Sequence, residues 1–204
     1  MVRNGLTNID ICNMALDKLG VQSIRSFEDS TTQANMCSRY YDQARKEVLR
    51  AHDWTFAKRD EALALLNMES GSWQYLYVYP DDCEKVLTVY GEGQKRLYKG
   101  EMGHFDIFSP RSEVTVIGTD IGKAYLEYIY DVRNVDKFSS EFVSALTFKL
   151  ACAMNTLSAS SSALEENMSL YQDALQRAAV SNRNEVKERV FFRSAVMDAR
   201  GYDG

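Results

Sequence analysis

A histidine, an aspartate, a threonine and a lysine lie within the stretch AHDWTFAKR, residues 51–59, and such side chains could share acid–base chemistry or hold a metal ion. His52 and Asp53 are adjacent, however, and adjacent residues on a helix point in different directions, which is poor geometry for a joint proton relay. Trp54 and Phe56 are the large apolar side chains of the stretch. We interpret both as structural anchors that dock the end of the preceding helix against a sheet or a later helix.

Other metal-binding and nucleophilic residue types lack the spacing that such sites need. The two histidines, His52 and His104, are far apart and have no set of candidate ligands at helical or hairpin spacing. The segment Gly91-Glu-Gly93 is not followed by a predicted helix, so it is typical of a turn between strands and not of a phosphate-binding loop. No zinc-type spacing or disulfide framework links the four cysteines, at positions 12, 37, 83 and 152. The sequence predicts no catalytic residue, cofactor-binding residue or metal ligand.

Paired acids leave an enzymatic alternative open. Glu165 and Glu166 fall in the first turn of a predicted helix, where the helix dipole favours acids. Asp81 and Asp82 fall in a predicted turn. A glycan hydrolase could use Asp81 with Asp106, provided that the two carboxylates face each other across a cleft.

The tyrosine-rich segment 73–79 leaves a second alternative. Aromatic side chains on a strand can stack on single-stranded nucleic acid, and the basic residues of segment 183–200 could contact its phosphates. A formal net charge of −5 argues against a general nucleic-acid binder, which is usually basic. We therefore favour Tyr75 and Tyr77 as sheet residues that also form candidate partner contacts.

Length and composition are those of a globular protein. The chain has 204 residues, of which 45% are apolar and 26% charged. The N-terminal residues lack the apolar segment of a signal peptide, and the least charged stretch, 142–163, is too rich in Ser, Thr and Asn to span a bilayer. These features predict a soluble protein with no membrane partner.

Hydrophobic periodicity divides the chain into zones of helix, strand and helix. Apolar residues at helical spacing predict two helices in residues 1–69. The first has Thr7 with Asp10 as its N-cap pair and stops at Gly20. The second is capped by Ser30 with Gln33 and has an apolar stripe that includes Cys37, Tyr41 and Val48. Short β-branched and aromatic runs predict five or six antiparallel strands in residues 70–131, with Pro80 at a strand end. Two further helices are predicted in residues 132–182, followed by a C-terminal extension, 183–204. The predicted fold class is α+β: a four-helix core from both chain ends with a central antiparallel β insert, a small sandwich or barrel.

The last predicted helix has its own apolar pattern. Leu164, Met168, Tyr171 and Leu175 recur at spacings of 4, 3 and 4, which predicts that they form its buried stripe. Beyond residue 179 the pattern becomes polar, and the segment carries a mixed, modestly basic set of side chains.

The order of several segments resembles the head-to-tail connector family of tailed phages, the proteins called tail tubular protein A, adaptor or gatekeeper. The resemblance covers roughly residues 9–180. Its features are the helix ending in Leu-Gly, the Trp54-x-Phe56-Ala57 signature and the Pro80-Asp81 turn, carried by ICNMALDKLGVQSI, FEDSTTQANMCSRYYDQARKEVLRAHDWTFAKR, YVYPDD and FSSEFVSALTFKLACAMNTLSAS.

The resemblance implies a structural virion protein at the head–tail junction, made in the host cytoplasm. Family subunits form a ring, commonly of twelve copies, between the portal protein and the tail nozzle or tail tube. The ring lines the channel through which double-stranded DNA passes without sequence-specific contacts. The family has no shared catalytic residues to carry over. The candidate partner contacts of this chain are Tyr75, Tyr77, Asp81, Arg183, Lys187, Arg189, Phe191, Phe192 and Arg193.

Overall fold

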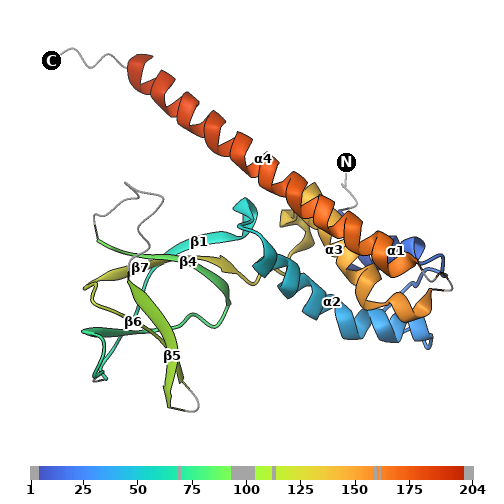
Figure 1. Cartoon of the computed structure of the whole chain (residues 1–204), viewed down its shortest axis with the longest axis horizontal. Coiled ribbons are helices and arrows are strands. Elements are labelled where there is room, and N and C mark those ends of the chain that lie inside the picture. Colours follow the sequence, from blue (N-terminus) through green and yellow to red (C-terminus); the bar gives the residue numbers. More distant parts are fainter. Residues whose placement is uncertain are drawn as a thin grey trace. The chain divides into compact units, whose positions relative to one another are not determined.

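The computed structural model describes residues 5–68, 70–92, 104–111, 114–158, 160 and 162–199, with side chains of the last helix described up to residue 181. The chain forms two compact units (Figure 1). We call residues 1–56 and 133–204 the helical unit and residues 57–132 the β unit. The described residues contain four α-helices and two antiparallel sheets, which confirms the α+β fold class.

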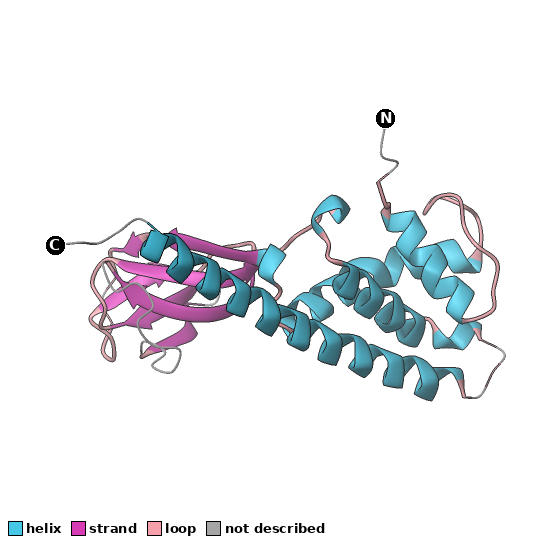
Figure 2. Cartoon of the chain, turned by 90° about the horizontal axis from the view of Figure 1, so that it is seen from above, coloured by secondary structure: helices cyan, strands magenta, loops and turns pink. Residues whose placement is uncertain are grey.

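The helical unit contains the α-helices. They are α1 (Asn8–Lys18), α2 (Thr32–Ala51), α3 (Ser140–Ala153) and α4 (Ala163–Ala199), with short 3₁₀ turns η1 (Thr55–Ala57), η2 (Val135–Lys137) and η3 (Asn155–Leu157). Figure 2 shows these helices lying alongside one another. α3 contacts α1, α2 and α4, and its side chains Phe142, Ala145, Leu146 and Leu150 are fully buried.

Capping side chains fix where the first two helices begin. Thr7 and Asp10 form a capping box at α1: the Thr7 hydroxyl accepts the Asp10 N–H at 3.1 Å, and the Asp10 carboxylate accepts the Thr7 N–H at 2.8 Å. The predicted Ser30 cap of α2 is wrong by one residue, because Thr31 has the extended backbone of an N-cap and accepts the Ala34 N–H at 3.1 Å. Beyond α1, Gly20 has a φ of +69°, which a residue with a Cβ rarely adopts.

The buried face of α4 differs from the predicted stripe. Leu164 and Met168 are 41% and 42% exposed, so their predicted burial is wrong. Small alanines let the helix approach α3 closely. Asn167 can lie among them because its amide donates to the carbonyl of Ala163 at 2.8 Å. The residues buried along this face are Ala163, Asn167, Tyr171, Ala174 and Ala178.

The β unit is built from two antiparallel sheets. One has the strand order β1-β7-β4 and the other β2-β3-β6-β5. The strands are β1 (Lys58–Ala62), β2 (Leu65–Leu66), β3 (Tyr75–Val78), β4 (Cys83–Gly91), β5 (Phe105–Arg111), β6 (Val114–Thr119) and β7 (Ala124–Tyr130). The first strand starts at Lys58 and not at the predicted boundary of residue 70. β1 has the sequence KRDEA, whose charged residues hide a strand from a search for apolar runs.

Both sheets contribute to one apolar cluster. Tyr77 and Ile117 come from the four-stranded sheet and face each other in its register. Val89, Leu126 and Tyr128 come from the three-stranded sheet, and all five side chains are nearly or fully buried. The β unit therefore has its own apolar core.

Candidate interaction surfaces

The aromatic residues of the stretch AHDWTFAKR form a cluster within the helical unit. α2 ends at Ala51, and Trp54 lies just beyond it with 2% exposure. The Trp54 indole N–H donates to the Val48 carbonyl at 2.7 Å, and its ring meets the Phe142 ring of α3 edge-on with centroids 5.0 Å apart. Phe56 packs on the same Phe142 ring at 5.1 Å. The end of α2 is thus held against α3.

The turn after Pro80 positions an acid beside an arginine. The Pro80 carbonyl accepts the Cys83 N–H at 3.0 Å, which closes the turn. Asp82 in this turn then accepts hydrogen bonds from Arg59 of β1 at 2.5 Å and from the Tyr128 hydroxyl of β7 at 3.0 Å. Burial raises the pKa of Tyr128, so this phenol remains a donor at neutral pH.

The same arginine also lies on an aromatic ring. The Arg59 guanidinium carbon is 4.0 Å from the centre of the Tyr130 ring, within the range of a cation–π contact. Arg59 and Asp82 have side chains about two-fifths exposed, at 40% and 39%. We call Arg59, Asp82, Tyr128 and Tyr130 the Arg59 cluster. It ties β1 to the Pro80 turn and β7, and it leaves the neighbouring Asp81 exposed to solvent.

The two candidate tyrosines of β3 have different environments. Tyr77 is 2% exposed, and its hydroxyl donates to the Ile121 carbonyl at 2.9 Å and accepts the Ala124 N–H at 3.4 Å. The prediction of Tyr77 as a partner contact is therefore wrong, because its ring belongs to the core and its hydroxyl is satisfied. Tyr75 is partly buried and lies close to Gly122, so part of its ring is available at the surface.

A shallow groove of about 400 Å³ lies on the four-stranded sheet. The loop before β3 forms one wall, and β5 forms the other. Trp73 from this loop lies on Gly118 of β6 and packs near the His104 ring, with centroids 4.9 Å apart. The lining residues are Ser70, Gly71, Ser72, Trp73, Leu76, Asp106, Ile107, Phe108 and Pro110.

This groove does not hold the pair of acids that the hydrolase alternative needs. Asp106 is the single carboxylate among the described residues that line it. Asp81 lies in the turn between β3 and β4 and is not part of the lining. General acid–base cleavage of a glycosidic bond uses two carboxylates on either side of the bond. The predicted pairing of Asp81 with Asp106 therefore has no support in this groove.

Metal-ligating residues do not gather in the part of the chain that the structure describes. There, no group of three His, Cys, Asp or Glu side chains could hold a metal ion. His52 instead meets the Trp54 ring edge-on at 4.9 Å. Cys12 and Cys37 are fully buried, with the Cys37 sulfur 3.6 Å from the Met154 sulfur, as small apolar side chains in a core would be.

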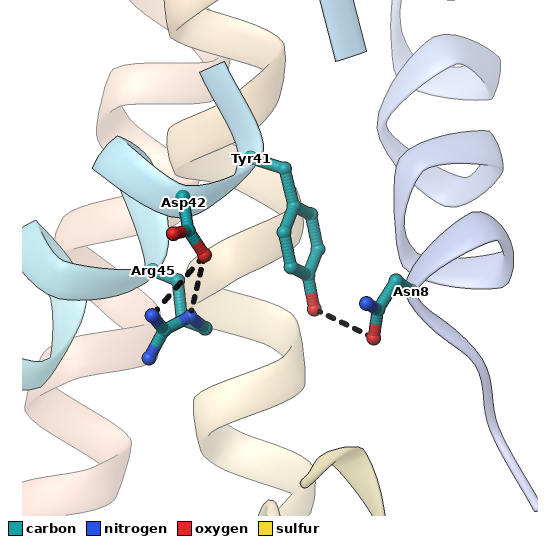
Figure 3. Close-up of polar contacts among 4 residues, drawn as sticks. All are labelled: Asn8, Tyr41, Asp42 and Arg45. Atoms are coloured by element: carbon teal, nitrogen blue, oxygen red, sulfur yellow. Dashed lines mark hydrogen bonds and ion pairs between the residues drawn. The ribbon is translucent and has the colours of Figure 1, made fainter. Parts of the chain in front are cut away.

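Polar contacts connect α1 and α2 inside the helical unit (Figure 3). The Tyr41 hydroxyl of α2 points toward Asn8 of α1 and donates to its side-chain oxygen at 3.3 Å. Arg45, one turn further along α2, is 1% exposed and donates to Asp42 at 3.1 Å. A buried arginine needs such partners, because an unpaired buried charge is strongly destabilising. Arg45 therefore has a structural role that the apolar pattern did not predict.

An ion pair between α2 and α3 makes the stability of the helical unit depend on pH. Lys149 donates to Glu47 at 2.7 Å, and this bond lowers the pKa of Glu47 and raises that of Lys149. Because the folded pKa of Glu47 lies below its unfolded value, its contribution is complete above the ordinary glutamate range and is lost as the pH falls through the folded pKa.

We expect Glu47→Gln to lower the free energy of unfolding at neutral pH by up to about 1 kcal/mol, as for a pair partly exposed to water. The difference from the parent should disappear under acid conditions that protonate Glu47. Urea unfolding followed by circular dichroism at both pH values measures this. Glu28→Gln, at an exposed site, is the control. An equal loss at both pH values would contradict the assignment.

The basic and aromatic candidates near the C-terminus lie on one continuous helix. α4 runs through the predicted boundary at residue 183 and ends at Ala199. The side chains of Arg183, Lys187, Arg189, Phe191, Phe192 and Arg193 lie outside the described residues.

Comparison with protein-family models finds none that matches the chain, and no curated protein matches it either. None of the described helices combines the length and the apolar character that a bilayer crossing needs.

Proposed function

We propose that the chain is a structural subunit of a phage head-to-tail connector. Its copies form a ring, twelve in number by the family pattern, between the portal protein and the tail nozzle or tail tube. The single observation that carries the proposal is the order of the segments that resemble the family, from ICNMALDKLG through AHDWTFAKR and YVYPDD to the helix after Phe138. In this role the protein acts in the virion, at the head–tail junction, after synthesis in the host cytoplasm.

The packing of these segments supports a structural role. Trp54 and Phe56, which carry the family signature, both pack on the Phe142 ring of α3. The Pro80 turn is held by the Arg59 cluster and presents Asp81 to solvent. In this proposal the four helices form one core, and the two sheets form a small sandwich inserted between its halves. The two units then offer different surfaces to the portal and the tail.

The charge of the chain suits a wall past which DNA moves. The formal net charge is −5, so the subunit as a whole repels a polyanion. Tight binding to phosphates would instead hold the DNA in place and depend steeply on salt. We propose that double-stranded DNA passes through the ring without sequence-specific contacts.

Electron microscopy of purified virions tests this proposal. We expect a ring of this chain between the portal and the tail nozzle, located with an antibody against the chain. The chain placed elsewhere in the particle, or absent from it, would contradict the proposal.

Asp81→Lys, in the exposed turn, should weaken assembly of the purified chain on its portal or nozzle more than Glu28→Lys, an exposed control in the helical unit.

A further inference from the structure

α3 covers only one face of α4. Within the helical unit α3 is the helix with extensive contacts to α4, which it meets along the alanine-rich face that includes Ala174 and Ala178. The 37 residues of α4 make a helix about 55 Å long, whereas the 14 residues of α3 reach about 21 Å. Much of α4 therefore extends past the helix that packs on it.

A second apolar stripe runs along α4 beside the buried face. Leu164 and Met168 begin it and are 41% and 42% exposed. Leu175 and Ala179 follow and are partly buried. Leu164 and Leu175 are eleven residues apart, as are Met168 and Ala179, and an eleven-residue repeat keeps residues on one face of a nearly straight helix.

The sequence continues this repeat to the end of the helix. Val186 follows Leu175 by eleven residues, Val190 follows Ala179 by eleven, and Met197 follows Val186 by eleven. α4 is helical through all these positions. The stripe thus spans residues 164–197, which is far more apolar helix than α3 can cover.

Charges are separated along the same helix. Residues 163–178 hold three acids and one base, whereas residues 183–193 hold four bases and two acids. The two halves of α4 therefore have opposite net charge. Two such helices side by side in the same direction would place like charges together, and in opposite directions they would place opposite charges together.

We propose that the stripe of α4 pairs with the same stripe of a second copy of this chain, with the two helices antiparallel. One two-fold register places Leu164 opposite Val190 of the second copy, Met168 opposite Val186, and Leu175 opposite Ala179, so that every pair is apolar. The same register places Glu165 and Lys187 of the second copy along the same edge of the interface. A two-fold pair buries the same patch on both subunits, so one stripe supplies both sides of the interface.

This pairing is a property of the free protein and does not depend on the connector role. Copies related by a two-fold axis point in opposite directions, whereas subunits of a ring all point the same way. The pair must therefore separate before a ring forms. Pairing would keep the apolar stripe covered until then, because large exposed apolar patches promote unwanted association.

Sedimentation velocity of the full chain over a wide range of concentration tests the pairing. We expect a reversible monomer–dimer equilibrium. Met168→Glu should weaken it by at least about tenfold, because two-fold symmetry places the new charge at two points of the interface. Val180→Glu is the matched control: Val180 is 58% exposed on the same helix, yet lies about 100° around it from Ala179. Circular dichroism checks that both variants fold.

A charge-exchange experiment tests whether the partner of the stripe is a second, antiparallel copy of the chain. Glu165→Lys and Lys187→Glu should each weaken the dimer, by about two- to fivefold for an exposed ion pair. The variant carrying both changes should regain the parent affinity, since the pair is restored with its sign reversed. A chain that remains monomeric at all concentrations would overturn the proposal and leave the stripe to a different protein. A dimer whose affinity is unchanged by Met168→Glu would overturn the proposal as well. So would a double variant whose loss of dimer affinity equals the sum of the two single losses.

Discussion

Trp54→Ala is expected to lower the free energy of unfolding of the helical unit by about 3–5 kcal/mol, the usual range for removing a large buried ring. The ring is 2% exposed and meets Phe142 edge-on, with centroids 5.0 Å apart. Its removal leaves a cavity between the end of α2 and the first turn of α3, and the loss also frees the Val48 carbonyl from its 2.7 Å hydrogen bond. Urea unfolding followed by helical circular dichroism measures the change.

Two further variants separate the contributions of Trp54. Trp54→Phe keeps an aromatic ring against Phe142 but removes the indole donor, so we expect a smaller loss, of which about 1 kcal/mol reflects the hydrogen bond. His52→Ala removes a ring that is partly exposed, whereas Trp54 is buried, so it should have the smallest effect of the three. If Trp54→Ala were no more destabilising than His52→Ala, the anchor would be a surface contact and its interpretation would be wrong.

The two ends of α1 could be predicted from the sequence because residues close together in the chain determine them. The Thr7–Asp10 capping box and the stop at Gly20 depend only on residues within a turn of each other. The apolar spacing of α2 likewise predicted the burial of Cys37, Tyr41 and Val48. Helix caps and helical spacing involve residues that are close together in the sequence, so a pattern search can find them.

Features that depend on distant partners were not predictable in this way. β1 reads as a charged segment, and it is a strand because β7 pairs with it, with Arg59 opposite Tyr128. The sequence predicted only that Asp82 lies in a turn with Asp81. The hydrogen bond from Arg59 to Asp82 forms because the fold places β1 beside this turn. The signal that could have found this cluster is weak, since one arginine and one aspartate 23 residues apart fit many arrangements.

The face that α4 buries shows the same limit most clearly. Leu164 and Met168 are larger and more apolar than Ala174 or Ala178, so a hydrophobicity pattern places them inside. The structure buries the alanines because close approach to α3 needs small side chains. Two apolar stripes on one helix cannot be ranked without knowing which neighbour comes close. The stripe left exposed is the feature on which the proposed helix pairing depends.

Gly118→Ala is expected to destabilise the β unit by about 1–3 kcal/mol, the usual effect of forcing extra volume into a packed site. An ideal Cβ at Gly118 would lie 2.4 Å from Cδ1 of Trp73 and 2.9 Å from Cε1 of Phe108, both inside any real contact distance. Trp73 must then leave the sheet. Because Trp54, the other tryptophan, lies in the helical unit, a red shift in fluorescence would report the new exposure of Trp73.

A second glycine provides the matched control for this substitution. Gly71 lies in the loop before β3, and a Cβ there meets nothing within 4 Å, so Gly71→Ala should leave both stability and fluorescence unchanged. Trp73→Ala removes one of the two obstructing rings. In that background Gly118→Ala should lose the part of its effect that comes from Trp73, and a double-mutant cycle measures this part as a coupling energy. If Gly118→Ala proved as silent as Gly71→Ala, Trp73 would not rest on the sheet, and the groove beside it would have a different wall.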